Sequence, residues 1–235
     1  MEASRQRRGE ALWCIEHFDL FEHLSPLQRI KLLRLVKLVQ YRRGETIYLP
    51  GDKGDTVYFL RKGRVKLAYL DQSGKRLTLM IRQHGELFGE TALIGEEERR
   101  LIAEALENAE MCTISKYDLL KFAEGDLKLS LRISKLAGRR LLEIENRLED
   151  LLFKDVPTRL ARLLCKLAAQ YGTPDDGVIE IRLRITHQDL ADLIGSTRET
   201  TSATLGGFER SGLIEKGRSK ILIKDLEALR AKAGL

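Results

Sequence analysis

The side chains best suited to a specific chemical task lie within 198–202. Arg198 and Glu199 are adjacent, and Ser202 follows about one helical turn later. An arginine can donate a fork of two hydrogen bonds to O6 and N7 of guanine, and a glutamate can accept a hydrogen bond from N4 of cytosine. On one helix, these side chains would reach base edges in the major groove.

Two short helices joined by a tight turn are predicted to position these side chains. Thr186 is a good cap for the first helix, and Ala191 is small enough to let a second helix cross closely. Gly195 supplies the turn, because glycine adopts positive φ angles without strain. Ser196 would cap the second helix, with Glu199 completing a capping box. The pattern is typical of a helix-turn-helix, although Glu199 could act only as part of the cap.

A β-hairpin is predicted over 214–223, directly after the second helix. As a wing, it would bring Arg218 and Lys220 near DNA phosphates, whose contacts add affinity without sequence information. The alternative is a solvated hairpin tip that contacts no DNA. Polar residues at the starts of the two helices are further candidates for phosphate contacts: Thr186, Gln188, Ser196 and Thr197.

Residues 41–114 differ in texture from the rest of the chain. Glycine recurs there about every ten residues and separates short runs with strand character. In 65–70, Val65, Leu67 and Tyr69 alternate with the other residues, as in a half-buried strand, and the segment 71–74 has the composition of a hairpin turn. Short strands at regular spacing predict a small antiparallel β-roll, or jelly roll.

Helices are predicted on both sides of this roll. Residues 11–40 show helical spacing, with Ser25-Pro26 as a helix start, and helical character returns at Lys116. The stretch 127–153 contains no proline and is predicted to form one long helix. Its apolar residues follow one another at spacings of 4, 4, 3, 4 and 3: Ile133, Ala137, Leu141, Ile144, Leu148 and Leu151.

This spacing is that of a coiled-coil seam, so we expect two copies of the chain to pair through it. The alternative is a helix that packs on the roll of its own chain. Val156-Pro157 marks a boundary, because proline disfavours helix at the preceding residue and suits the start of a new one. A helix 158–171, a loop 172–177 and a strand 178–181 are predicted to follow.

The expected architecture is therefore α+β and has three parts. An N-terminal antiparallel β-roll with flanking helices occupies residues 1–125 and acts as a sensor domain. A dimerisation helix occupies 126–155, and a C-terminal winged helix-turn-helix domain occupies 156–235.

Composition excludes several other classes of protein. The net charge of +6 permits DNA binding without establishing it. No apolar run reaches the roughly 18 residues of a membrane span, and 1–10 do not resemble a secretion signal, so we expect a cytoplasmic protein with no membrane partner. The sequence shows no nucleophile paired with a base, no metal-ligand cluster and no phosphate loop, so no motif indicates an enzyme.

Cys14, Cys112 and Cys165 are widely spaced, so a disulfide framework is not expected, and a redox role for Cys14 is the alternative.

Several separate motifs resemble the CRP/FNR family of bacterial regulators, over a span from about Phe18 to about Lys224. They are the segments 44–47 with Gly51-Asp52, Gly63 before a strand, the Gly-Glu-Leu-Phe-Gly-Glu-Thr-Ala-Leu segment 85–93, the segment 153–156, and Arg198-Glu199. The resemblance implies a cyclic-nucleotide-binding-type β-roll, a dimerising helix and a winged helix. It implies double-stranded DNA and a second copy of the chain as partners, with RNA polymerase as a third if the protein is an activator.

In family members that bind cyclic nucleotides, the segment around a Gly-Glu pair and an arginine hold the cyclic phosphate and ribose. The resemblance maps an effector pocket onto Gly89, Glu90, Thr91, Arg99, Arg100, Ile144 and Glu145. Two of these residues depart from the pattern. Arg100 stands where serine or threonine is typical, and Ile144, at a position that contacts adenine, offers no hydrogen bond.

These departures disfavour cyclic AMP as the effector without excluding it. Arg99 and Arg100 could instead hold a different anion, or Glu90 and Arg99 could pair with each other as a structural remnant. A regulator without an effector is a further alternative. No residue pattern indicates a metal, a haem or an iron–sulfur cluster: the three cysteines are too few and scattered, and the histidines are expected to be exposed.

The recognition helix also departs from the family pattern, which usually includes a second arginine near its middle. Here Ala203, Thr204 and Leu205 follow Ser202, so one guanine contact is missing, although Ala203 could touch a thymine methyl group. A palindromic site still follows from a two-fold dimer. The rival function is a nucleotide- or anion-binding regulatory module that acts on a protein partner, and the winged helix argues against it.

Overall fold

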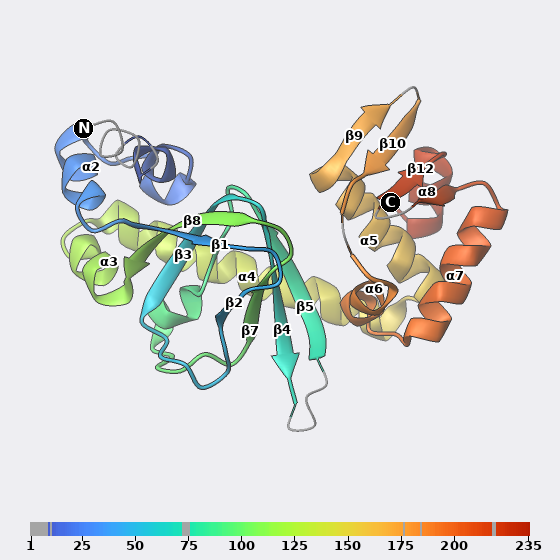
Figure 1. The fold of residues 1–235 in the computed structure, drawn as a ribbon, viewed down its shortest axis with the longest axis horizontal. Helices are drawn as coiled ribbons and strands as arrows, with labels where there is room; N and C mark the ends of the chain where they lie inside the picture. The colour runs from blue at the N-terminus through green and yellow to red at the C-terminus, as the bar shows by residue number, and fades with distance from the viewer. Residues whose placement is uncertain (1–8, 10, 72–75, 176, 184, 218–219) are drawn as a thin grey trace. The chain divides into compact units, whose positions relative to one another are not determined.

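The computed structural model describes residues 9, 11–71, 76–175, 177–183, 185–217 and 220–235 (Figure 1). The chain forms two compact units, residues 1–140 and 141–235. The long predicted helix is present as α4 (Leu127–Phe153) and contains residues of both units.

The first unit contains two four-stranded antiparallel sheets, which confirm the predicted roll. One sheet has the order β1-β8-β3-β6 and the other the order β2-β7-β4-β5. The strands are β1 (Lys37–Tyr41), β2 (Thr46–Tyr48), β3 (Thr56–Lys62), β4 (Arg64–Leu70), β5 (Arg76–Gln83), β6 (Leu87–Phe88), β7 (Ile102–Ala105) and β8 (Ala109–Ser115). Most of the predicted turn 71–74 lies outside the described residues.

The expected alternation in β4 is interrupted by a β-bulge. The register with β5 shifts between Leu67 and Ala68. As a result, Ala68 is buried and Tyr69 is exposed, whereas strict alternation predicts the opposite for both. A bulge adds one unpaired residue and so exchanges the two faces of the strand beyond it.

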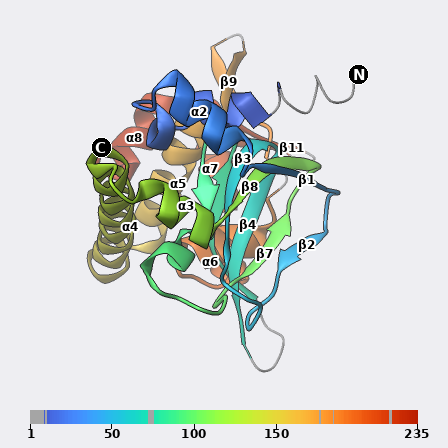
Figure 2. The ribbon, with the colours of Figure 1, turned by 90° about the vertical axis from the view of Figure 1, so that its left-hand side faces the viewer.

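Helices cover one end of the roll. Residues 11–16 are helical and are followed by η1 (Asp19–Phe21) and α2 (Pro26–Leu33), whose predicted start is confirmed by a capping box between Ser25 and Gln28. The prediction of helix as far as residue 40 is wrong, because 37–41 form β1 and pair with β8. Short apolar runs fit both periodicities, and here strand pairing decides. Helix α3 (Lys116–Ala123) lies beside β8 (Figure 2).

Two apolar clusters form the core of this unit. One joins the helices to the roll and includes Phe21, Phe59 and Leu129; the other lies within the roll. Cys14 and Cys112 meet in the first cluster and form a disulfide with a Cα–Cα distance of 6.4 Å. This corrects the expectation of unlinked cysteines, since folding brings together two residues that lie 98 positions apart.

The second unit combines helices with a small antiparallel sheet of order β11-β12-β10-β9. Its elements after α4 are α5 (Val156–Tyr171), β9 (Gly172–Asp175), β10 (Val178–Ile181), α6 (His187–Ile194), α7 (Arg198–Arg210), β11 (Ile214–Gly217), β12 (Lys220–Ile223) and α8 (Leu226–Ala233). The hairpin 214–223 is confirmed. The loop predicted over 172–177 is partly wrong, because 172–175 pair with β10 as an edge strand.

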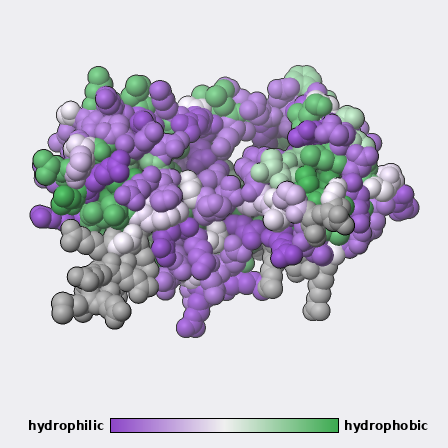
Figure 3. Space-filling view, turned by 90° about the horizontal axis from the view of Figure 1, so that it is seen from above, coloured by the Kyte–Doolittle hydropathy of each residue, from purple (hydrophilic) through white to green (hydrophobic). Residues whose placement is uncertain are grey.

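The surface is predominantly polar. Hydrophilic residues cover most of the face seen in Figure 3, with smaller hydrophobic patches between them. Within the described part of the chain, no helix is both long and apolar enough to cross a membrane.

Candidate nucleic-acid interface and effector site

Helices α6 and α7 form the predicted helix-turn-helix (Figure 1). Thr186 caps α6 in a capping box: its hydroxyl accepts from the backbone N–H of Asp189, whose carboxylate accepts from the backbone N–H of Thr186. Gly195 ends α6 with a φ of 62°. A Cβ at Gly195 would overlap the side chain of Leu151, so both the backbone angle and the close packing require glycine.

The second helix begins one residue later than expected. Thr197, not Ser196, is the cap, and its hydroxyl accepts from the N–H of Thr200 at 3.2 Å. Glu199 therefore does not complete a capping box, and the view of Glu199 as part of the cap is wrong. Serine and threonine are both good caps, so their order in the sequence could not select between them.

Arg198 and Glu199 are exposed in the first turn of α7. Neither side chain has a hydrogen bond or ion pair with another residue that the structure describes. Ser202 is half-buried, and its Oγ lies 2.8 Å from Nδ1 of His187 at the start of α6. His187 was not predicted as a site residue, since a contact between two helices leaves no signal in residue spacing.

Most candidates for phosphate contacts are exposed, but several already have protein partners. The hydroxyl of Thr186 also bonds to Asp189, and Gln188 Nε2 donates to Asp192 Oδ1 at 2.7 Å. Lys220 Nζ lies 2.9 Å from the carboxylate of Glu180. Hydrogen bonds from Arg182 and Lys220 hold the pKa of Glu180 below its usual range, so Glu180 opposes the charge of Lys220. Arg218 lies outside the described residues.

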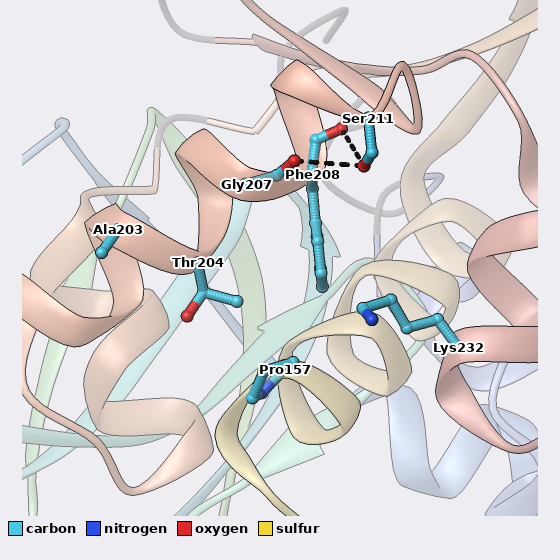
Figure 4. Close-up of a pocket in the computed structure, with 7 residues that line it drawn as sticks. All are labelled: Pro157, Ala203, Thr204, Gly207, Phe208, Ser211 and Lys232. Carbon is cyan, nitrogen blue, oxygen red and sulfur yellow. Dashed lines mark hydrogen bonds between the residues drawn. The ribbon is translucent and has the colours of Figure 1, made fainter.

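A shallow hollow lies beside α7. Its volume is about 460 Å³, and Ala203, Thr204 and Gly207 line it together with Pro157 of α5 and Lys232 of α8 (Figure 4). The Ser211 hydroxyl bonds back to two carbonyls of α7. The hollow therefore lies between α7, α5 and α8 within the second unit.

In the first unit, Gly89 and Arg99 meet as the resemblance implies. Arg99 is only 4% exposed. Its Nη1 donates to the carbonyl of Gly89 at 3.1 Å, and its Nη2 donates to the carbonyl of Thr56. Gly89 has a φ of 76°, and a Cβ there would lie 2.9 Å from Arg99 Nη1, so a side chain cannot fit.

Glu90 does not pair with Arg99, which corrects that alternative. Glu90 begins the short helix η2 (Glu90–Ile94), and its carboxylate accepts from Arg140 of α4 at 2.8 Å. Arg140 also donates to the carbonyl of Leu87. Arg100 is exposed and pairs with Glu96 at 2.7 Å. Thr91, Ile144 and Glu145 are exposed.

Arg99 is a buried cation with no acidic partner among the described residues. Its guanidinium lies 4.6 Å from the ring centroid of Tyr48 and 5.8 Å from that of Tyr58, and its Nε has no hydrogen-bond partner within the described part of the chain. Burial raises the pKa of Tyr58 to about 12 and raises that of Tyr48 as well, while the charge of Arg99 opposes both shifts. Both tyrosine rings are thus neutral beside this positive charge, and an unpaired guanidinium suits an anion.

The predicted seam on α4 divides into two parts. Leu141, Ile144 and Leu148 are 57%, 60% and 55% exposed. Ile133 packs against the first apolar cluster, and Leu151 approaches Gly195. Ile133 therefore packs on the roll and Leu151 packs within the second unit, while the middle of the helix presents an exposed apolar stripe. Pairing of two copies through this stripe stays a prediction.

Metal-binding side chains and histidines are distributed over the fold without forming a metal site among the described residues. The residues that the structure describes contain no cluster of three metal-binding side chains. His23 is not exposed as expected: its Nε2 lies 3.2 Å from a carboxylate oxygen of Asp126. Folding supplies this partner from a residue 103 positions away.

Comparison with known proteins identifies both halves of the chain. Residues 38–126 match the family description "Cyclic nucleotide-binding domain", and residues 158–232 match "Crp-like helix-turn-helix domain". A "CRP-like cAMP-activated global transcriptional regulator" from Mycobacterium tuberculosis is 28% identical over 214 residues, which cover 91% of this chain and 96% of that protein.

Two further relatives support the same assignment. The "Global nitrogen regulator" of Synechocystis sp. is 31% identical over 191 residues, which cover 80% of this chain and 85% of that protein. A solved CRP/FNR-family transcriptional regulator from Thermus thermophilus is 30% identical, with a TM-score of 0.69, and the match covers 85% of this chain and 99% of that one. With a sensor domain of the cyclic-nucleotide-binding type and a DNA-binding helix-turn-helix, the chain belongs to the CRP/FNR family of transcriptional regulators.

Proposed function

We propose that this regulator is a homodimer that binds a palindromic site in double-stranded DNA. The observation that carries this proposal is the stripe of Leu141, Ile144 and Leu148, three large apolar side chains that are more than half exposed along one face of α4. Burial of such side chains against a second copy stabilises a dimer by removing apolar surface from water. Because a two-fold dimer carries two recognition helices, its preferred DNA site has two related halves.

In this proposal, Arg198, Glu199 and Ser202 read base edges. The free, exposed guanidinium of Arg198 suits a guanine, and the free carboxylate of Glu199 suits a cytosine amino group. Thr186, Gln188, Ser196, Thr197, Lys220 and Arg218 contact phosphates. The contribution of Lys220 is reduced because it must share its charge with Glu180.

The chain divides by function into a sensor domain in 1–125, a dimerisation helix in 126–155 and a DNA-binding domain in 156–235. We assign no catalytic role to any of these parts. The protein acts in the cytoplasm, where it has access to chromosomal DNA. If it activates transcription, RNA polymerase is its further partner.

The sensor domain binds a small anion at Arg99. Keeping a guanidinium in a nearly dry site without a carboxylate is unfavourable, and an anionic ligand would supply the missing charge. The Mycobacterium tuberculosis relative is named for activation by cyclic AMP. For this chain, however, the pairing of Arg100 with Glu96 and of Glu90 with Arg140 leaves fewer groups for a cyclic nucleotide, and Ile144 offers adenine no hydrogen bond.

Selection of binding sites from random duplex DNA tests this function. We expect the purified protein to enrich a palindrome, with a guanine in each half-site that becomes replaceable in the Arg198→Ala variant. The selection is run with and without cyclic AMP. Enrichment in both arms supports a regulator independent of this nucleotide, whereas enrichment only with cyclic AMP would contradict our view of the pocket. Enrichment of single half-sites only would contradict the dimer.

A further inference from the structure

A side-chain hydrogen bond between His187 and Ser202 connects α6 with α7. His187 is the first residue of α6, and Ser202 lies on α7 one turn after Arg198 and Glu199. The Nδ1 atom of His187 is 2.8 Å from Ser202 Oγ, and both side chains are half-buried. Within the described residues, neither side chain has another hydrogen-bond partner, so the two polar groups depend on each other.

The chemistry of this pair determines what Ser202 can offer to a base. A serine hydroxyl has one proton and can donate or accept, and a neutral imidazole has one donor nitrogen and one acceptor nitrogen. The Nε2 atom of His187 has no partner among the described residues. On a surface that faces phosphates and water, the tautomer with its proton on Nε2 is favoured, because that N–H can donate to a phosphate oxygen.

In this tautomer, Nδ1 is the acceptor, so the hydroxyl of Ser202 donates its only proton to His187. Toward a base, the oxygen of Ser202 can then act only as an acceptor. In the major groove, the groups that donate to an acceptor are N6 of adenine and N4 of cytosine. Without His187, the hydroxyl could rotate and donate equally well to N7 or O6 of guanine or to O4 of thymine.

We propose that His187 is a positioning residue that sets base specificity by fixing Ser202 as a hydrogen-bond acceptor. The inference rests on the proposed role of Ser202 in reading a base. It adds His187 to the residues that determine which base is preferred. It predicts adenine or cytosine, in preference to guanine or thymine, at the base that Ser202 contacts. One hydrogen bond corresponds to a preference of about 3- to 10-fold.

Three variants test this proposal in the full-length protein. His187→Asn keeps an acceptor, because the asparagine Oδ1 can occupy the place of Nδ1. His187→Phe keeps a ring and removes the acceptor. Ser202→Ala identifies the base position that Ser202 reads, as the one position at which preference changes. Dissociation constants are measured on a selected duplex and on the set with each of the four bases at that position, and thermal unfolding verifies that each variant is folded.

We expect the native protein and His187→Asn to prefer adenine or cytosine by about 3- to 10-fold, and His187→Phe to lose the preference at that position alone. The guanine preference due to Arg198 should be unchanged. In the His187→Phe, Ser202→Ala double variant, no additional loss of preference is expected, since both changes remove the same interaction.

Three results would overturn the proposal: a preference for guanine or thymine in the native protein, an unchanged preference in His187→Phe, or an equal loss of affinity at every position. A different result would overturn the proposed function of Ser202 instead. If Ser202→Ala changes no base preference while Arg198→Ala still does, Ser202 does not read a base, and the general account of DNA binding stands.

Discussion

The proposed anion site at Arg99 and the proposed DNA-reading site on α7 differ in how their charged side chains are surrounded. At Arg99, a cation is enclosed by carbonyl groups and aromatic rings and has no carboxylate beside it among the described residues. At α7, Arg198 and Glu199 are exposed and have no partner within the described part of the chain. The first arrangement favours a ligand that brings its own negative charge into a dry site, and the second favours groups that are read at a hydrated surface.

A first prediction compares two cationic residues of the DNA-binding unit. Replacement of Arg198 by alanine should weaken binding to the selected site by about 1–3 kcal/mol and relax the preference at one base pair of each half-site. Lys220→Ala should weaken binding to all sequences alike and by less, because its ammonium already pairs with Glu180. Fluorescence anisotropy titrations on the selected duplex and on single-base variants measure both effects. Equal and uniform losses would contradict base reading by Arg198.

A second prediction concerns two glycines with opposite requirements. Gly89→Ala should lower the stability of the sensor domain by about 1–3 kcal/mol, because φ is positive and the new Cβ would meet Arg99 and Thr56. Gly207→Ala is the control, since Gly207 lies inside α7 and a Cβ there would point into open space beyond the helix's own backbone. We expect that variant to gain about 0.5–1 kcal/mol. Calorimetric unfolding checks both values, and a harmless Gly89→Ala would contradict the close approach.

Periodicity and caps predicted elements well where local signals dominate. The bounds of α4, the helix cap at Thr186 and the turn at Gly195 follow from local sequence, and the structure agrees with them. Tertiary pairing decides the rest. Residues 37–41 became a strand because β8 lies beside them, and 172–175 became a strand because β10 does.

Partners of site residues were the least predictable feature, because they come from distant parts of the chain. Glu90 binds Arg140, 50 residues away, rather than the nearby Arg99. Ser202 binds His187 across the turn between two helices. Spacing in a sequence indicates which side chains share a face of one element, whereas contacts between elements depend on how those elements pack.

A third prediction follows from the disulfide bond between Cys14, in the N-terminal helical segment, and Cys112 of β8. Under non-reducing, denaturing conditions we expect one free thiol per chain, Cys165, and three after reduction. The bond closes a loop of 98 residues, and loops of that length correspond to about 4–5 kcal/mol of stabilisation in the chain-entropy model. Thermal unfolding with and without reductant should therefore differ for the native protein and coincide for Cys14→Ser. Three free thiols before reduction would contradict the bond.

Within the second unit, α4 is tied directly to the DNA-binding elements. Arg147 Nη2 donates to the carbonyl of Asp192 in α6 at 2.8 Å, and Asp150 pairs with Arg162 of α5 at 2.7 Å. A change in how two copies of α4 pair would thus move the attached recognition helices. On the scale of the whole molecule, an effector would act by favouring one such arrangement, and only by as much as it binds that arrangement more tightly.

If two copies pair through one stripe of α4, glutamate substitutions at two adjacent leucines should have opposite effects on dimerisation. Leu141 and Leu142 are each 57% exposed on the same helix, but only Leu141 belongs to the seam. Leu141→Glu places a charge in the proposed interface and should produce monomers, because burying an unpaired carboxylate is strongly unfavourable. Leu142→Glu is matched in chemistry and exposure, points about 100° away around the helix, and should remain a dimer.

Sedimentation equilibrium of the two glutamate variants, combined with their affinity for the selected palindrome, tests the proposed dimer most directly. We predict that Leu141→Glu is monomeric and binds the palindrome no better than a single half-site, while Leu142→Glu is dimeric and binds like the native protein. A Leu141→Glu variant that remains dimeric, or that binds the full palindrome as tightly as the native protein does, would contradict it.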